Sequence, residues 1–142
     1  MVAKQLSVFI ENRKGRLGEV LNVLKENKIN ILSLSLADTT EYGLLRLIVS
    51  DENLSKEKLS NAGFSTVLSD VLIVKISHKT GSLQGLLEVL SEKDINVEYM
   101  YGLSVKDVNA FVVVKPSDLK RAEEIMEKCG VKTVSSEEIA NI

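Results

Sequence analysis

Residues 15–31, GRLGEVLNVLKENKINI, return 66 residues later as residues 81–97, GSLQGLLEVLSEKDINV. The glycine, the spaced leucines, a glutamate and an Ile-Asn pair recur in the same order in both stretches. Further along, the offset grows by one, so that Gly63 corresponds to Gly130 and Thr66-Val67 to Thr133-Val134. Self-similarity at a fixed spacing indicates that the chain consists of two copies of one structural unit.

The two copies have the same predicted order of strands and helices. In the first copy, apolar residues at positions i, i+3, i+4 and i+7 form one helix face over residues 15–27, which carries Leu17, Val20, Leu21 and Leu24. The other predicted elements of this copy are strands 6–10, 29–36, 44–49 and 64–68, a polar turn at 38–43, and a helix 55–62 ended by Gly63.

The second copy gives the same order with small differences in length. Pro116 stops a strand, and Ser117 is the expected cap of the helix that follows. The predicted strands are 71–77, 95–103, 110–115 and 132–134, and the predicted helices are 82–93 and 117–129.

The order βαββαβ predicts an α+β fold in which two helices cover one face of a four-stranded antiparallel sheet. We therefore expect two ferredoxin-like modules in tandem, at residues 1–69 and 70–142. The halves meet at Ser69-Asp70 with almost no linker, so we expect them to pack together.

Three strands are apolar on both faces rather than alternating. These runs are residues 44–49, 71–74 and 111–114. Burial on both faces predicts a cover for the sheet face without helices, and a second copy of the chain is the simplest cover, which makes a homodimer. The alternative is a few apolar residues tolerated at the surface.

Composition and charge exclude several functional classes. The chain has 142 residues, a net charge of −2, one cysteine and one histidine. Its mixed charges and aliphatic strands argue against nucleic acid as a partner.

The chain has neither a run of about 18 apolar residues nor a signal-peptide pattern, which predicts a cytoplasmic protein without membrane contact. One cysteine and one histidine predict no metal site, and we expect no cofactor. His78 has no catalytic partner by spacing and Cys129 is expected to be a small buried residue, so we expect no enzyme.

A loop with a glycine precedes the first helix of each copy. It reads Asn12-Arg13-Lys14-Gly15-Arg16-Leu17 in the first copy and His78-Lys79-Thr80-Gly81-Ser82-Leu83 in the second. A helix that starts there leaves backbone N–H groups unpaired, and these can hold a carboxylate. Asn12 can both donate and accept hydrogen bonds. The alternative is that each glycine only makes a turn.

Asn30 and Asn96 stand at equivalent positions where the second strand of each copy begins. Asparagine is unfavourable in strands, so its presence needs a reason. A turn out of the preceding helix and a contact with a ligand are both open.

These residues resemble the ACT domain, a small regulatory βαββαβ module. The resemblance rests on the pattern Asn-x-x-Gly-x-Leu, here residues 12–17, and on Ile29-Asn30-Ile31, and both recur in the second copy. It covers almost the whole chain and is closest to the stand-alone tandem ACT proteins of bacteria. It implies that an amino acid binds between modules, where the glycine loop of one module faces the second strand of another.

Carried over by position, Asn12 and Asn30 match two asparagines of the serine-binding members, and Asn96 matches in the second copy. The chain departs from the family pattern elsewhere. His78 replaces the loop asparagine, Lys14 and Thr80 replace a common proline, and Ile10 replaces a histidine that contacts the ligand in some members.

We therefore expect a regulatory sensor that binds an amino acid or a similar small metabolite. Its carboxylate would meet N–H groups near Gly15 or Gly81, beside Arg16 and Ser82, and its ammonium would meet Asn12, Asn30 or backbone carbonyls. Its side chain would lie against Leu17, Leu32 or Leu34 in the first copy, or against Leu83 and Tyr99 in the second. The alternative is a structural or regulatory subunit that binds another protein through its apolar sheet face, which a discrete homodimer formed by the chain alone would argue against.

Overall fold

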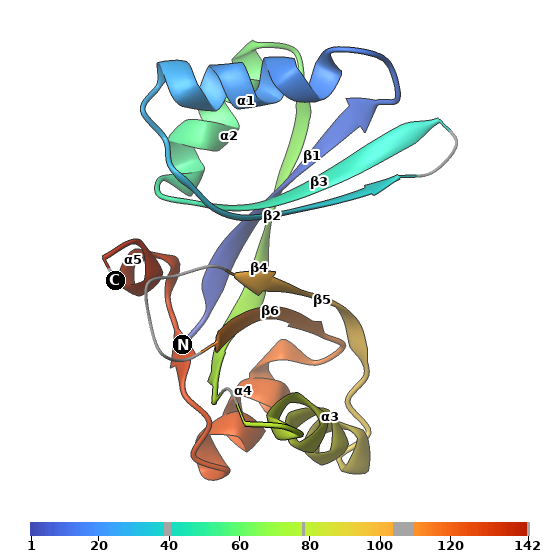
Figure 1. The fold of residues 1–142 in the computed structure, drawn as a ribbon, viewed down its shortest axis with the longest axis vertical. Helices are drawn as coiled ribbons and strands as arrows, with labels where there is room; N and C mark the ends of the chain where they lie inside the picture. Colours follow the sequence, from blue (N-terminus) through green and yellow to red (C-terminus); the bar gives the residue numbers. More distant parts are fainter. Residues whose placement is uncertain (39–40, 78, 104–109, 142) are drawn as a thin grey trace. The chain divides into compact units, whose positions relative to one another are not determined.

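A computed structural model describes residues 1–38, 41–77, 79–103 and 110–141 (Figure 1). The chain divides into two compact units, Lys4–Ser69 and Asp70–Ile142, the latter together with Met1–Ala3. The elements in chain order are β1 (Ala3–Glu11), α1 (Arg16–Glu26), β2 (Ile31–Asp38), β3 (Tyr42–Val49), α2 (Glu52–Asn61), β4 (Ser65–Ile76), α3 (Ser82–Glu92), β5 (Val97–Leu103), β6 (Ala110–Pro116), α4 (Leu119–Lys128), β7 (Thr133–Val134) and α5 (Ser136–Ala140).

In the unit Lys4–Ser69, hereafter the first unit, the strands lie in the order β2-β3-β1-β4. The pairs β1·β3 and β2·β3 are antiparallel. Helices α1 and α2 cover one face of this sheet, because Val20 and Leu24 of α1 and Leu59 of α2 share a core with strand residues such as Leu45 and Leu47. Figure 1 shows both helices on the same side of the strands.

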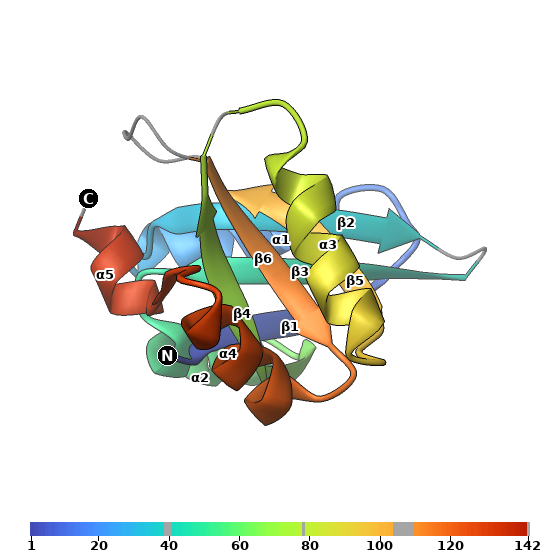
Figure 2. The same ribbon diagram turned by 90° about the horizontal axis from the view of Figure 1, so that it is seen from below.

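The second unit, which contains Asp70–Ile142, repeats this arrangement with the strand order β4-β6-β5, and β7 pairs with β4. Helices α3 and α4 pack on one face, where Leu86, Leu90 and Met126 meet Leu72 and Val114 (Figure 2). Both units therefore have the βαββαβ order with helices on one face, and the expected α+β fold of two ferredoxin-like modules is confirmed.

The structure corrects four details of the sequence analysis. The strands expected at 64–68 and 71–77 are one continuous strand, β4. The cap of α4 is Asp118, whose side chain accepts from Arg121 N, and not Ser117. Cys129, expected to be buried, is exposed. Helix α5 was not expected, although Ser135 and Glu138 have the spacing of a capping box, and the Ser135 hydroxyl accepts from the Glu138 N–H.

The apolar runs of β4 and β6 are buried within the single chain. Val71, Ile73, Phe111 and Val113 lie on the sheet face away from α3 and α4, and each is at most 2% exposed. The homodimer expected from these runs stays a prediction.

Asp51 caps α2, since its carboxylate accepts a hydrogen bond of 3.0 Å from the Leu54 N–H. We expect Asp51→Ala to lower the free energy of unfolding by about 1 kcal/mol, because this N–H loses its acceptor. Urea denaturation measures the change. Asp51→Asn keeps a capping oxygen and is the matched control, and equal losses in the two variants would contradict a capping role.

Candidate functional site

The two glycine loops form left-handed turns at the start of α1 and α3. Gly15 has a φ of +89° and Gly81 a φ of +85°, a region that L side chains rarely adopt. In the first loop the Arg13 N–H donates to Glu11 O over 2.8 Å, and the Arg16 N–H donates to Arg13 O. The second loop repeats this closure between Ser82 N and Lys79 O, so the two turns have the same geometry.

Helices α1 and α3 differ from the others in their N-termini. Side chains of Asp51, Asp118 and Ser135 accept from the first turns of α2, α4 and α5. Among the helices of the described residues, only α1 and α3 begin without a side-chain cap. Their first-turn N–H groups, at the positive end of the helix dipole, are placed to bind an anion such as a carboxylate.

Asn12 lies at the entry to the first of these turns. Its backbone N–H donates to Glu41 O over 3.2 Å, which ties the loop to the connection between β2 and β3. Its side chain is exposed. The side-chain amide group therefore does not pack in the core and can contact a ligand bound at the turn.

Arg16 and Leu17, the two residues after Gly15, face the interior. The guanidinium of Arg16 stacks on Phe64 at 4.2 Å from the ring centroid, and its Nη1 lies 2.5 Å from Glu19 Oε2. Leu17 is half-buried and packs against the core of the first unit. The structure thus gives both side chains packing contacts.

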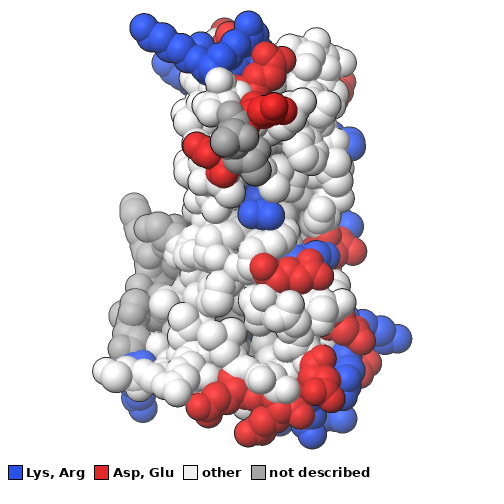
Figure 3. Space-filling view, turned by 90° about the vertical axis from the view of Figure 1, so that its right-hand side faces the viewer, with Lys and Arg blue, Asp and Glu red and all other residues white. Residues whose placement is uncertain are grey.

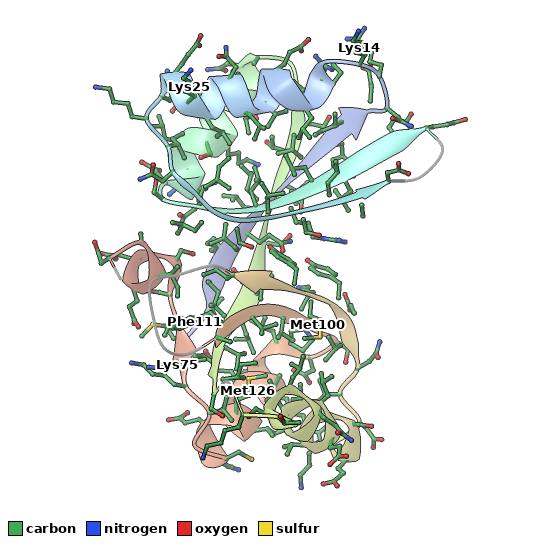
Figure 4. The ribbon with its side chains drawn as sticks, viewed as in Figure 1. Lys14, Lys25, Lys75, Met100, Phe111 and Met126 are labelled. Atoms are coloured by element: carbon green, nitrogen blue, oxygen red, sulfur yellow. The ribbon has the colours of Figure 1, made fainter. Side chains whose placement is uncertain are left out.

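Asn30 lies at the far end of β2 from Asn12. Figure 4 labels Lys14 at the glycine turn and Lys25 at the opposite end of α1, just before the connection to Asn30. The eight residues of β2 separate the two asparagines by roughly 26 Å at about 3.3 Å per residue. One unit therefore does not bring Asn12 and Asn30 to the same amino acid.

A repeated pair of hydrogen bonds joins the backbone of the asparagine before β2 and before β5 to a serine. The Asn30 N–H donates to Ser50 Oγ over 2.9 Å, and the Ser50 N–H donates back to Asn30 O. Asn96 and Ser117 make the same pair, at 3.0 Å and 2.8 Å. Ser50 and Ser117 were not singled out from the sequence, although their equivalent positions could have indicated a shared role.

The remaining residues expected at a site lie on different faces. Leu32 is half-buried, whereas Leu34 is 51% exposed on the helix-covered face, opposite Leu47. Tyr99 is half-buried and stands opposite Lys115, on the face without helices. Leu34 and Tyr99 therefore do not form equivalent walls in the two units.

In the second loop, Ser82 Oγ lies 2.8 Å from Ser77 Oγ. Leu83 is exposed, with 36% of its surface accessible. Asn96 is also exposed. His78, the counterpart of Asn12, lies outside the described residues.

Acidic and basic side chains lie close together where they occur on the face drawn in Figure 3. In the part of the chain that the structure describes, no three His, Cys, Asp or Glu residues are grouped to hold a metal ion. Within the same residues, every helix is too short or too polar to cross a membrane.

Comparison with known proteins places the whole chain in one family. The family model described as "ACT domain pair" matches residues 1–142. A search of curated proteins found no match.

Among solved structures, protein BT0572 from Bacteroides thetaiotaomicron is similar, with 34% identity, a TM-score of 0.93, and coverage of 100% of this chain and 98% of that one. The regulatory subunit of aspartate kinase from Thermus thermophilus, in its ligand-free form, shares the fold at 13% identity, with a TM-score of 0.60 and coverage of 89% and 95%. Its counterpart from Thermus flavus matches at 16% identity and a TM-score of 0.62, covering 89% of this chain and 92% of that one.

Proposed function

Since this chain belongs to the ACT domain pair family, we propose that it is a regulatory protein that binds an amino acid and has no catalytic site. The observation that carries the proposal is the pair of uncapped helix N-termini at Gly15 and Gly81. An α-carboxylate accepts hydrogen bonds from such N–H groups and is favoured there by the helix dipole.

We place the ammonium group of the ligand against Asn12, whose amide oxygen can accept a hydrogen bond. Asn30 is too far away to contribute from the same unit. It contributes only when another module presents its β2 to this loop, and we place that module in a second copy of the chain. Ligand binding then favours one arrangement of the modules over another, and the difference in affinity between the two arrangements is the regulatory signal.

A thermal-shift screen against the twenty amino acids, nucleotides and divalent metals tests the proposal. A ligand that binds only the folded chain raises the melting temperature. We expect one or a few amino acids to give a selective rise. A rise with a nucleotide or a metal alone would contradict the proposal and favour another ligand.

A homodimer is the second part of the proposal. Four large side chains of the first unit are exposed on β1, β2 and β3 in the single chain, between 46% and 57%, namely Phe9, Leu34, Leu36 and Tyr42. Within this unit β2 is an edge strand, whose unpaired backbone groups can pair with another chain.

We expect light scattering to give twice the chain mass of 15.7 kDa. Leu36→Lys should shift the chain toward the monomer, because a charge on the edge strand opposes association. Val67→Lys, at a residue of β4 with 46% exposure, is the matched control. A monomeric natural chain would contradict the homodimer and favour the alternative, a subunit that binds a different protein.

A further inference from the structure

A cavity of about 340 Å³ lies between α3, α4 and the end of β4 in the second unit. Its walls are mainly aliphatic and come from both helices, including Leu86, Val89, Leu90, Met126 and Val131. Figure 4 labels Met126, which projects from α4 into the space between the helices and the strands. The volume is in the range of sites that hold small molecules.

The first unit fills the equivalent place with its own side chains. Ser82 corresponds to Arg16, and Val131 to Phe64, as the matching hydrogen bonds Val131 N–Met126 O and Phe64 N–Leu59 O show. Arg16 stacks on Phe64 and pairs with Glu19. The second unit has serine, valine and Gly85 at these three positions, and all three line the cavity. The cavity thus lies where the first unit places the side chains of Arg16, Phe64 and Glu19, hereafter the plug of the first unit.

The polar end of the cavity selects the charge of a ligand. Ser77 and Ser82 line it with hydroxyls 2.8 Å apart, beside the uncapped N-terminus of α3. No aspartate or glutamate is among the described residues that line it. Lys75 contributes its backbone, because alternation with Val74 and Ile76 places its side chain on the face away from the helices. Hydroxyl donors and a positive helix end favour an anion, and none of the described lining residues is acidic and could pair with an ammonium.

We propose that this cavity binds a short aliphatic monocarboxylate, with its hydrocarbon chain between α3 and α4 and its carboxylate at Ser77 and Ser82. The ligand class differs from the amino acid proposed for the first glycine turn, because it lacks the α-ammonium, and at the second turn it takes the place of that amino acid. Of the described residues expected at those turns, Ser82 alone also lines this cavity.

The cysteine at the cavity provides a direct assay. Cys129 lines the cavity, is exposed, and is the only cysteine in the chain. A thiol reagent such as DTNB therefore reacts at this one position, which also borders a second pocket lined by Arg121 and Lys128, so the variants below are needed to assign protection to this cavity. We expect isocaproate at about ten times its Kd to slow the reaction of Cys129 about tenfold, by occupancy. Leucine, which is isocaproate with an added ammonium, and the neutral isocaproamide should protect far less.

Two variants test the position of the ligand. Ser82→Arg combined with Gly85→Glu and Val131→Phe transplants the plug of the first unit and should abolish protection by isocaproate. Gly85→Leu is the second variant, since a Cβ at Gly85 meets nothing within 4 Å and glycine is a poor helix former, so the chain should fold. It should weaken protection by narrowing the mouth of the cavity.

Absence of protection in the natural chain would overturn the proposal, as would protection that survives in both variants. Equal protection by leucine would overturn the assignment of the head group. None of these outcomes bears on amino-acid binding at the first glycine turn, because the variants leave residues 12–17 unchanged.

Discussion

Leu47→Ala is expected to lower the free energy of unfolding by about 3 kcal/mol, measured by urea denaturation. Leu47 is fully buried on β3 and belongs to the core that α1 and α2 cover. Truncation removes its apolar contacts and leaves a cavity, since close-packed neighbours relax only in part.

Leu34 is the matched control for this substitution because it lies directly opposite Leu47 in the β2·β3 ladder and on the same face. It is 51% exposed in the single chain, so Leu34→Ala should change the stability of the chain by less than about 0.5 kcal/mol when both variants are measured at a concentration where the chain is monomeric. Equal losses from the two leucines would contradict the burial that defines this core.

Asn12→Ala is expected to weaken amino-acid binding about 30-fold, measured by calorimetry. The reason is the loss of a hydrogen bond to a charged group, which contributes about 2 kcal/mol. Stability should stay nearly unchanged, because the side chain is exposed and only the backbone N–H ties Asn12 to Glu41.

Asn61→Ala, at an exposed asparagine that ends α2, is the control for a change of residue type away from the loop. An Asn12→Ala chain with unchanged affinity would remove Asn12 from the site. The melting temperature of the same sample shows whether the variant is folded, so a fall in affinity that is caused by unfolding can be recognised.

The fold could be predicted from the sequence because its repeat and its apolar spacing are local signals. The helical spacing of four apolar residues marks one helix face whatever the helix packs against, and these residues are Leu17, Val20, Leu21 and Leu24. The continuity of β4 through Ser69-Asp70 was missed, because two polar residues in succession suggest a turn and only pairing with neighbouring strands overrides it.

The site could be predicted only in part. The glycine before each helix correctly indicates a left-handed turn, but the separation of Asn12 from Asn30 depends on the length and direction of β2. Arg16 could not be assigned from the sequence, since its contact with Phe64 joins residues 48 positions apart. The cavity at Ser82 could not be predicted from the sequence, because it depends on how side chains pack in the second unit and how this packing differs from that of the first.

The most direct test of the central claim is a titration of the ¹⁵N-labelled chain with the amino acid found in the thermal-shift screen. If the uncapped turns bind the carboxylate, the amide signals of Leu17 and Gly18, or of Leu83 and Gln84, should shift most, since these N–H groups belong to the first turns of α1 and α3. Saturable binding without shifts at either turn would contradict the account.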